Sequence, residues 1–211
     1  MTRSLGFVMT LIILVACSSS PGSSTPTAAS VAVQPGDLPS TMHRCSISGD
    51  VNTYLNGLKT KDPATYTSTQ TEWADAQSKG ATAAQVVFYS DSAANCENVA
   101  STVANLSAAA YPLVVNFSIQ FKDEASAANG YTSGQIFGID RTTLKANGAP
   151  VVEGAQSGLG ANSIVLSTTV LNQAFYIAVW QNKAFMVILG IINMDSTTGQ
   201  KVATSENNRI K

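Results

Sequence analysis

The sequence predicts an α+β domain, with a twisted, mainly antiparallel sheet and helices packed on it. Within the expected strand over 113–122, residues 115–122 alternate strictly between apolar and polar side chains, which is the pattern of a strand with two different faces. Two further strand-like segments, 174–181 and 184–194, are joined by Asn182-Lys183, a pair that suits a tight hairpin turn. Segments with a helical repeat lie before and after these strands, so helices and strands are expected to share one core.

Residues that suit helix ends mark the expected helices. Asp50 is expected to cap a short helix, because apolar residues recur after it at helical spacing. Asp62-Pro63 predicts a second helix over 63–79, since proline suits the first helical position and Gly80 suits the stop. Three more helices are expected, over residues 93–109, 124–135 and 196–209.

The last expected strand, 184–194, is apolar on both faces, so we place it in the centre of the sheet with both faces covered. Its eleven residues are too few to span a membrane. Residues 138–160 are expected to be mostly loop. Their glycine-rich end, 154–160, lacks the lysine of a phosphate-binding loop and is read as a turn. Further strands are expected over residues 85–89, 151–153 and 163–169.

The amino terminus has the features of a bacterial lipoprotein signal peptide. Arg3 gives it a positive start, and residues 5–15 are almost wholly apolar but too short to cross a bilayer as a helix. Residues 14–17, Leu-Val-Ala-Cys, resemble the bacterial lipobox, in which the cysteine thiol receives diacylglycerol. The resemblance implies cleavage after residue 16 and a lipid on Cys17. The alternative is an ordinary secretory signal in which this cysteine is incidental.

These features divide the chain into three expected parts. Residues 1–16 are a signal peptide, and the lipid on Cys17 would hold the protein on the extracytoplasmic side of a membrane of the bacterial cell envelope. Residues 17–39 are rich in Ser, Pro, Thr and Ala without a helical or strand repeat, so they are expected to be a flexible tether. Residues 40–211 are expected to form a single globular domain.

Cys45 and Cys96 remain as a pair once Cys17 is assigned to the lipid. A disulfide is expected between them, because an exported protein folds in an oxidising compartment. Cys96 recurs with Val99 and Val103 at helical spacing, which puts its thiol on a buried face. A redox or metal-binding cysteine pair is disfavoured, because the pair lacks the CxxC spacing and His43 is the only histidine in the sequence.

The side-chain inventory argues against several functions. The chain has 12 Lys and Arg against 13 Asp and Glu, without a basic run, so nucleic acid is not an expected partner. No metal or cofactor motif occurs, and we expect no cofactor. The single histidine, His43, is expected at the surface and not in a catalytic triad. A pair of carboxylates is the remaining catalytic option, and its candidates are Asp75, Asp91, Asp140 and Glu153.

Two sets of side chains are candidates for ligand binding. Asn116, Ser118 and Gln120 form the polar face of the strand over 113–122. This face is expected to be solvated, or to line a ligand cleft if a helix or loop overhangs it. Aromatic side chains that could wall a sugar or peptide site, although core packing is their default, are Tyr111, Tyr131, Tyr176 and Trp180.

The order of the elements resembles one group of bacterial domains. Helices come first, the strand over 113–122 runs into Lys-Asp-Glu-Ala, and a late apolar hairpin is followed by a helix. This order resembles the extracellular sensor domain of actinobacterial serine/threonine kinases and small lipoproteins of the related Mog1/PsbP-type fold. The resemblance covers about residues 38–210, and it carries no signature motif. This chain has one candidate disulfide where the kinase domains have two, so no family site residue is carried over.

We therefore expect a membrane-anchored extracytoplasmic lipoprotein with a non-catalytic ligand-binding or sensing domain. The sequence does not choose between a small molecule, a glycan and a protein as its ligand. One alternative is a structural or partner-binding envelope lipoprotein, which an exposed apolar patch would mark. The other is a carboxylate-dependent envelope hydrolase, which would need two acids about 5 to 10 Å apart in a pocket.

Overall fold

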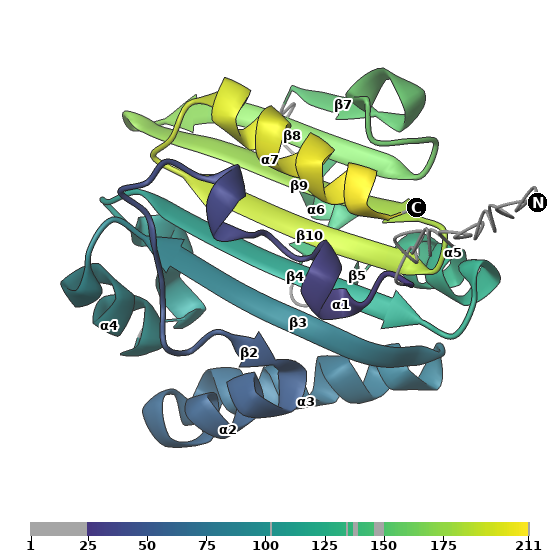
Figure 1. Ribbon diagram of the computed structural model, residues 1–211, viewed down its shortest axis with the longest axis horizontal. Helices are drawn as coiled ribbons and strands as arrows, with labels where there is room; N and C mark the ends of the chain where they lie inside the picture. The colour runs from purple at the N-terminus through teal and green to yellow at the C-terminus, as the bar shows by residue number, and fades with distance from the viewer. Residues whose placement is uncertain (1–24, 102, 134, 137–138, 146–149, 211) are drawn as a thin grey trace, which may run out of the picture.

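The structure, a computed structural model, describes residues 25–101, 103–133, 135–136, 139–145 and 150–210 (Figure 1). Its centre is an eight-stranded antiparallel sheet in the order β1-β3-β4-β10-β9-β8-β7, with β2 also paired to β3. The predicted α+β class is confirmed. The strands of this sheet are β1 (His43–Arg44), β2 (Gly49–Asp50), β3 (Ala81–Ser90), β4 (Leu113–Phe121), β7 (Val151–Glu153), β8 (Ser163–Val170), β9 (Gln173–Asn182) and β10 (Phe185–Ile192).

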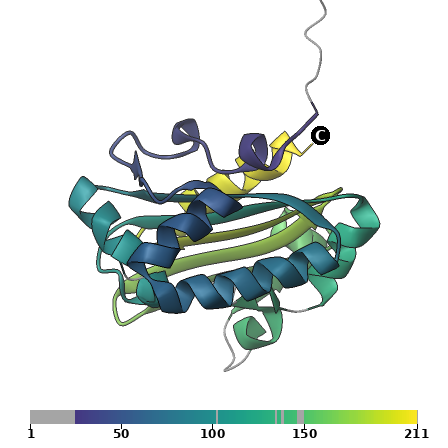
Figure 2. The ribbon, with the colours of Figure 1, turned by 90° about the horizontal axis from the view of Figure 1, so that it is seen from below.

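Helices cover both faces of the sheet (Figure 2). One face carries α1, the 3-10 helix η1 and α7, and the other carries α2, α3, α4 and α5. Two hydrophobic layers therefore lie on either side of one sheet. The helices are α1 (Ala28–Val31), α2 (Val51–Lys61), α3 (Pro63–Ser78), α4 (Ala93–Ser101), α5 (Glu124–Thr132), α6 (Arg141–Lys145) and α7 (Ser196–Arg209), and the 3-10 helices are η1 (Pro35–Asp37), η2 (Val103–Ala108) and η4 (Gly154–Ser157).

The helix starts lie at the residues predicted from capping. The Asp50 carboxylate accepts the backbone N–H groups of Asn52 and Thr53 at the start of α2. Hydrogen bonds from Thr53 lower the pKa of the Asp50 carboxyl. Asp62 caps α3 with proline at its first position, and Asp195 caps α7. These aspartates satisfy amide groups that would otherwise have no partner within the helix.

Strand β10 lies between β4 and β9, as its two apolar faces predicted. Its residues alternate between the layers: Val187 and Leu189 face α1 and α7, whereas Met186 and Ile188 face α3 and α5. Gly190 is the exception within the strand because it contributes no side chain to either layer. The missing side chain leaves space on the face of the sheet that α2 and α3 cover.

Three expected elements differ in extent. The helix expected over 93–109 divides into α4 and η2, and the helix expected over 124–135 ends at Thr132. The expected loop over 138–160 contains α6 and β7, together with half of a two-stranded sheet formed by β5 (Gln135–Ile136) and β6 (Ile139–Asp140). Its glycine-rich end is a turn, in which Gly158 and Gly160 have positive φ angles.

The first described segment corrects the expected domain boundary. The sequence predicts a flexible tether through residue 39, but residues 25–42, here called the N-terminal strap, lie across the sheet face that carries α7 (Figure 1). Ala28, Val31, Ala32 and Val33 are buried there. The short apolar run within a polar segment buries enough surface to hold the strap on the sheet. The packed unit therefore begins well before residue 40.

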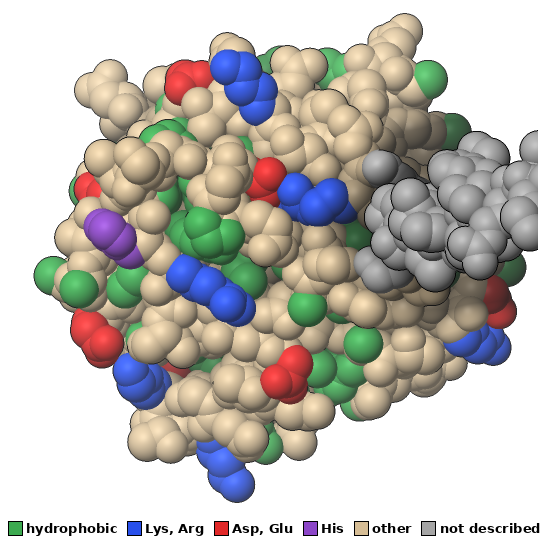
Figure 3. All heavy atoms as spheres, viewed as in Figure 1, with side chains coloured by type: hydrophobic (Ala, Val, Ile, Leu, Met, Phe, Trp, Pro, Cys, Tyr) green, Lys and Arg blue, Asp and Glu red, His purple; other side chains and the backbone are tan. Residues whose placement is uncertain are grey.

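The predicted disulfide is confirmed. Cys45, just after β1, is bonded to Cys96 of α4, and their Cα atoms are 5.1 Å apart. Both residues are buried in the layer that also contains Val99. The bond joins α4 to the edge of the sheet. His43, the purple side chain in Figure 3, is exposed at the surface beside it.

Candidate functional site

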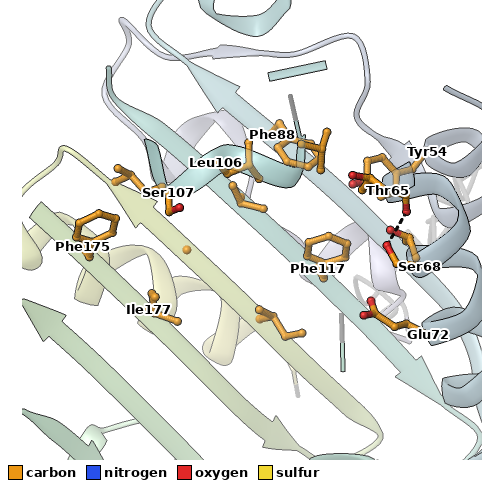
Figure 4. A pocket seen from close by; sticks show the side chains of 16 residues that line it. Tyr54, Thr65, Ser68, Glu72, Phe88, Leu106, Ser107, Phe117, Phe175 and Ile177 are labelled. Atoms are coloured by element: carbon orange, nitrogen blue, oxygen red, sulfur yellow. Dashed lines mark hydrogen bonds between the residues drawn. The ribbon is translucent and has the colours of Figure 1, made fainter. Parts of the chain in front are cut away.

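A cavity of about 490 Å³ lies between the sheet and the helices of the α2–α3 side. Its volume is within the range of small-molecule binding sites in proteins. Strands β4, β9 and β10 form its floor, α2 and α3 form one side, and η2 lies across one end (Figure 4). It is the candidate functional site.

The floor of the cavity is open because a glycine occupies its middle. Val115 of β4, Gly190 of β10 and Ile177 of β9 lie side by side across the three strands. A Cβ atom placed on Gly190 would lie 3.9 Å from the Val115 Cβ, which is an ordinary contact. The space above Gly190 is therefore unfilled because the side chain is missing, and not because the backbone bulges away.

Aromatic rings form one wall. Tyr54 of α2 lies 5.7 Å from Phe88 of β3 and 6.0 Å from Phe117 of β4, measured between ring centroids. The rings of Phe88 and Phe117 are 6.5 Å apart in an edge-to-face arrangement. Figure 4 shows Phe175 and Ile177 on the far side of the floor. Such a lining favours a ligand with a large apolar part.

Polar groups lie along α3 at one side of the cavity. Thr65, Ser68 and Glu72 are spaced three and four residues apart, so one face of the helix presents all three (Figure 4). The Thr65 hydroxyl donates to the Asp62 carboxylate at 2.7 Å, so this end of the site also holds a second acid. Burial raises the pKa of the Tyr54 phenol, and Asp62 and Glu72 raise it further.

The charge at this end is therefore negative. The lining residues described by the structure include the acid Glu72 and no Lys, Arg or His. A carboxylate or phosphate brought into the cavity would meet the Glu72 carboxylate and would find no cationic side chain among the described lining residues. A neutral or positively charged head group fits this end better.

The candidate residues on β4 do not line this cavity. Asn116 and Ser118 lie on the opposite face of the sheet, under the strap and α7, and both are fully buried. The expectation of a solvated face is wrong for these two residues, because the strap covers them. The Asn116 side chain accepts the Val33 N–H at 3.1 Å and donates to the Ile188 carbonyl at 3.1 Å, while Gln120, near the end of the strand, is half-buried.

The aromatic residues singled out from the sequence also lie elsewhere. Tyr131, on α5, packs into the core on the α2–α3 side of the sheet, and Tyr176 and Trp180 pack under α7. Tyr111 is half-buried beside the other layer. The rings that do line the cavity were not predicted from the sequence. Gly190, a glycine inside an apolar strand, was the one indication that a side-chain position in the core is empty.

The candidate acids are dispersed. Asp75 pairs with Lys79 on α3, Glu153 pairs with Lys145, and Asp91 accepts a hydrogen bond from Asn95. The side chain of Asp140 lies outside the described part. Within the described residues, no group of three or more His, Cys, Asp or Glu side chains is placed to hold a metal ion.

Large exposed apolar side chains are few in the described part of the chain. They are Val152 on β7 and the pair Val170 and Leu171 at the β8–β9 turn. Residues 1–24, and with them Cys17, lie outside the described residues. None of the described helices has both the length and the apolar character needed to cross a membrane.

Likeness to known proteins is found among solved structures. No protein-family model matches the chain, and no curated protein matches it. Among solved structures, it is similar to the crystal structure of the extracellular domain of PknH from Mycobacterium tuberculosis, with 12% sequence identity and a TM-score of 0.46. The alignment covers 88% of this chain and 92% of that chain.

Proposed function

We propose that this chain is an extracytoplasmic lipoprotein, held on a membrane by lipid on Cys17, whose domain binds an apolar ligand without chemically changing it. The cavity between the sheet and α2–α3 carries the binding part of the proposal. Its floor lacks a side chain at Gly190, and its walls are aromatic and aliphatic. The signal-peptide and lipobox pattern of residues 1–17 supports the anchoring part.

The ligand class follows from the two ends of the cavity. The apolar floor favours a hydrocarbon chain or ring system, and the α3 end favours a head group that donates hydrogen bonds or carries positive charge. Glu72 and the nearby Asp62 disfavour an anionic head. We propose a lipid-like molecule with a hydroxyl or amine head as the occupant.

Displacement of a fluorescent probe tests this proposal. The neutral aromatic probe 1-N-phenylnaphthylamine is titrated into the full-length chain in detergent below its critical micelle concentration, and is then displaced with dodecylamine, dodecanol or dodecanoate. We expect saturable binding with one site and weakest displacement by dodecanoate. Non-saturable fluorescence, or dodecanoate as the strongest competitor, would contradict the proposed ligand class.

The anchor has its own test. The mature protein is purified from the membrane fraction of the producing bacterium, and its amino-terminal peptide is measured by mass spectrometry. We expect the peptide to begin at Cys17 and to carry the added mass of diacylglycerol. A Cys17→Ala variant is expected to lose the added mass and to leave the membrane fraction. An unmodified Cys17, or cleavage at another residue, would refute lipidation.

A further inference from the structure

Arg209 of α7 makes more side-chain hydrogen bonds to the N-terminal strap than any other described residue. The Arg209 guanidinium donates to the carbonyl of Val31 at 3.0 Å and to that of Ala32 at 3.1 Å. It also forms two hydrogen bonds of 2.9 Å to the two oxygens of the Asp37 carboxylate. This arginine therefore clamps both α1 and η1. The sheet adds two side-chain hydrogen bonds: Asn116 of β4 accepts the Val33 N–H, and the Tyr89 hydroxyl of β3 donates to the Val33 carbonyl at 3.2 Å.

A buried acid lies three residues before this arginine. Glu206 is fully buried, and no described residue makes a well-aligned hydrogen bond to either of its carboxyl oxygens. Burial raises the pKa of the Glu206 carboxyl well above its usual value. The smaller effects are those of Arg209 and of a side-chain hydrogen bond with Asn116, which lower this pKa, and of Asp37, which raises it. The acid is therefore held in its neutral form to higher pH than an exposed glutamate.

The layer around this acid contains other unsatisfied polar atoms. Ser118 Oγ and Trp180 Nε1 are buried without a hydrogen-bond partner in the described part of the chain. The two residues lie in one row across the sheet, separated by Val187 of β10, on the face that the strap and α7 cover. Buried polar atoms are normally paired. Lifting of the strap would let water reach these two atoms and hydrogen-bond to them.

We propose that Glu206 is a proton-controlled latch for the N-terminal strap. With the carboxyl protonated, Arg209 holds Asp37 and the two strap carbonyls, and the strap lies closed. Loss of the proton places a negative charge three residues from Arg209 on the same helix, where side chains are neighbours. The ionised Glu206 then competes with Asp37 for the guanidinium and favours an open strap in which both acids reach water.

The direction of the pH dependence follows from the raised pKa. In the pH range between the usual pKa of a glutamate and the raised pKa of Glu206, the closed form binds one more proton than the open form. The closed strap therefore becomes less stable relative to the open strap as pH rises through that range. The other titratable groups in the layer between the sheet and α7 do not reverse this sign. Arg209 stays charged, and burial raises the pKa of Tyr176, on the β9 strand beneath α7, to about 12, so it stays neutral.

Hydrogen exchange of the strap amides tests the latch. The protection of the Val33 and Ala32 amides is measured by NMR in the full-length chain at pH 5 and pH 8, and each value is compared with that of a Glu206→Gln variant at the same pH. Because both proteins have the same intrinsic exchange rate at a given pH, their ratio reports strap opening. We expect protection in the wild type to fall by about tenfold or more relative to the variant between the two pH values.

Two controls separate the latch from general loosening. Glu97→Gln, which removes an exposed acid of α4, is expected to retain the wild-type pH dependence. Amides of β4 and β10 are expected to keep their protection at both pH values. Asp37→Asn is expected to weaken the strap at both pH values and to reduce the pH dependence, because it removes the acid that competes with Glu206 for Arg209. It provides a test if Glu206→Gln fails to fold. Equal pH dependence in wild type and Glu206→Gln, or its loss in Glu97→Gln, would overturn the proposal.

Discussion

Replacing both Cys45 and Cys96 with alanine is expected to lower the free energy of unfolding by about 4 kcal/mol. The disulfide joins residues 51 positions apart, and closing a loop of that length removes much conformational freedom from the unfolded chain. Both sulfur atoms also lie in a buried layer, so the replacement leaves less apolar contact there. Urea unfolding followed by circular dichroism measures the difference.

The matched control for this prediction is Cys17→Ala, which removes the remaining cysteine of the chain without touching the disulfide. Its unfolding midpoint is expected to equal that of the wild type. A loss below about 1 kcal/mol in the double variant would mean that the disulfide does not constrain the unfolded chain as its sequence separation implies.

Replacing Gly190 with leucine is expected to weaken binding of the apolar probe by about a hundredfold, equivalent to about 2.7 kcal/mol. The new Cβ atom would make an ordinary contact with Val115, and the rest of the side chain would enter the cavity above the floor. Because the cavity accommodates the leucine, the fold is expected to remain intact and the ligand-free chain to be at least as stable as the wild type. Probe titration and urea unfolding of the same protein give the two readouts.

Gly36→Leu is the matched control for that prediction. It introduces the same side chain at a position with open space around it, on the strap and on the opposite face of the sheet. Probe affinity is expected to be unchanged. Unaltered affinity in Gly190→Leu, with the fold retained, would place the probe outside the cavity.

Much of the fold is predictable because local rules and burial agree. Asp50, Asp62 and Asp195 are typical capping residues, and the helices begin directly after them. The two apolar faces of β10 correctly predict its central position, and the exposure of His43 is also as expected. The disulfide was accessible by the same reasoning, since Cys96 lies on the apolar side of its helix.

The polar face of β4 shows where this reasoning fails. The alternation of Asn116 and Ser118 with apolar residues predicts that the two faces of the strand differ. It does not predict whether the polar face contacts solvent or another part of the protein. Asn116 is buried because its amide satisfies both a strap N–H and a strand carbonyl. A contact between residues 33 and 116 depends on the tertiary arrangement, and the composition of the strap instead resembles a linker.

The cavity was not predicted because it depends on the register of three strands. Val115, Gly190 and Ile177 meet only through the pairing of β4, β10 and β9, and the aromatic residues Tyr54 and Phe88 reach them from other elements. Each of these residues has an ordinary core pattern in the sequence. The vacancy arises from the absence of one side chain, which periodicity does not reveal.

In our proposal, an apolar ligand occupies the cavity on the α2–α3 side of the sheet. This proposal is tested most directly by intermolecular nuclear Overhauser effects between protonated dodecanol and a deuterated, methyl-labelled chain. We predict contacts from the ligand chain to the methyl groups of Ile177, Ile188 and Ile192, and none to Val187 or Leu189 beneath the strap. Contacts confined to Val170 and Leu171 at the exposed β8–β9 turn, or to the strap face, would contradict the account.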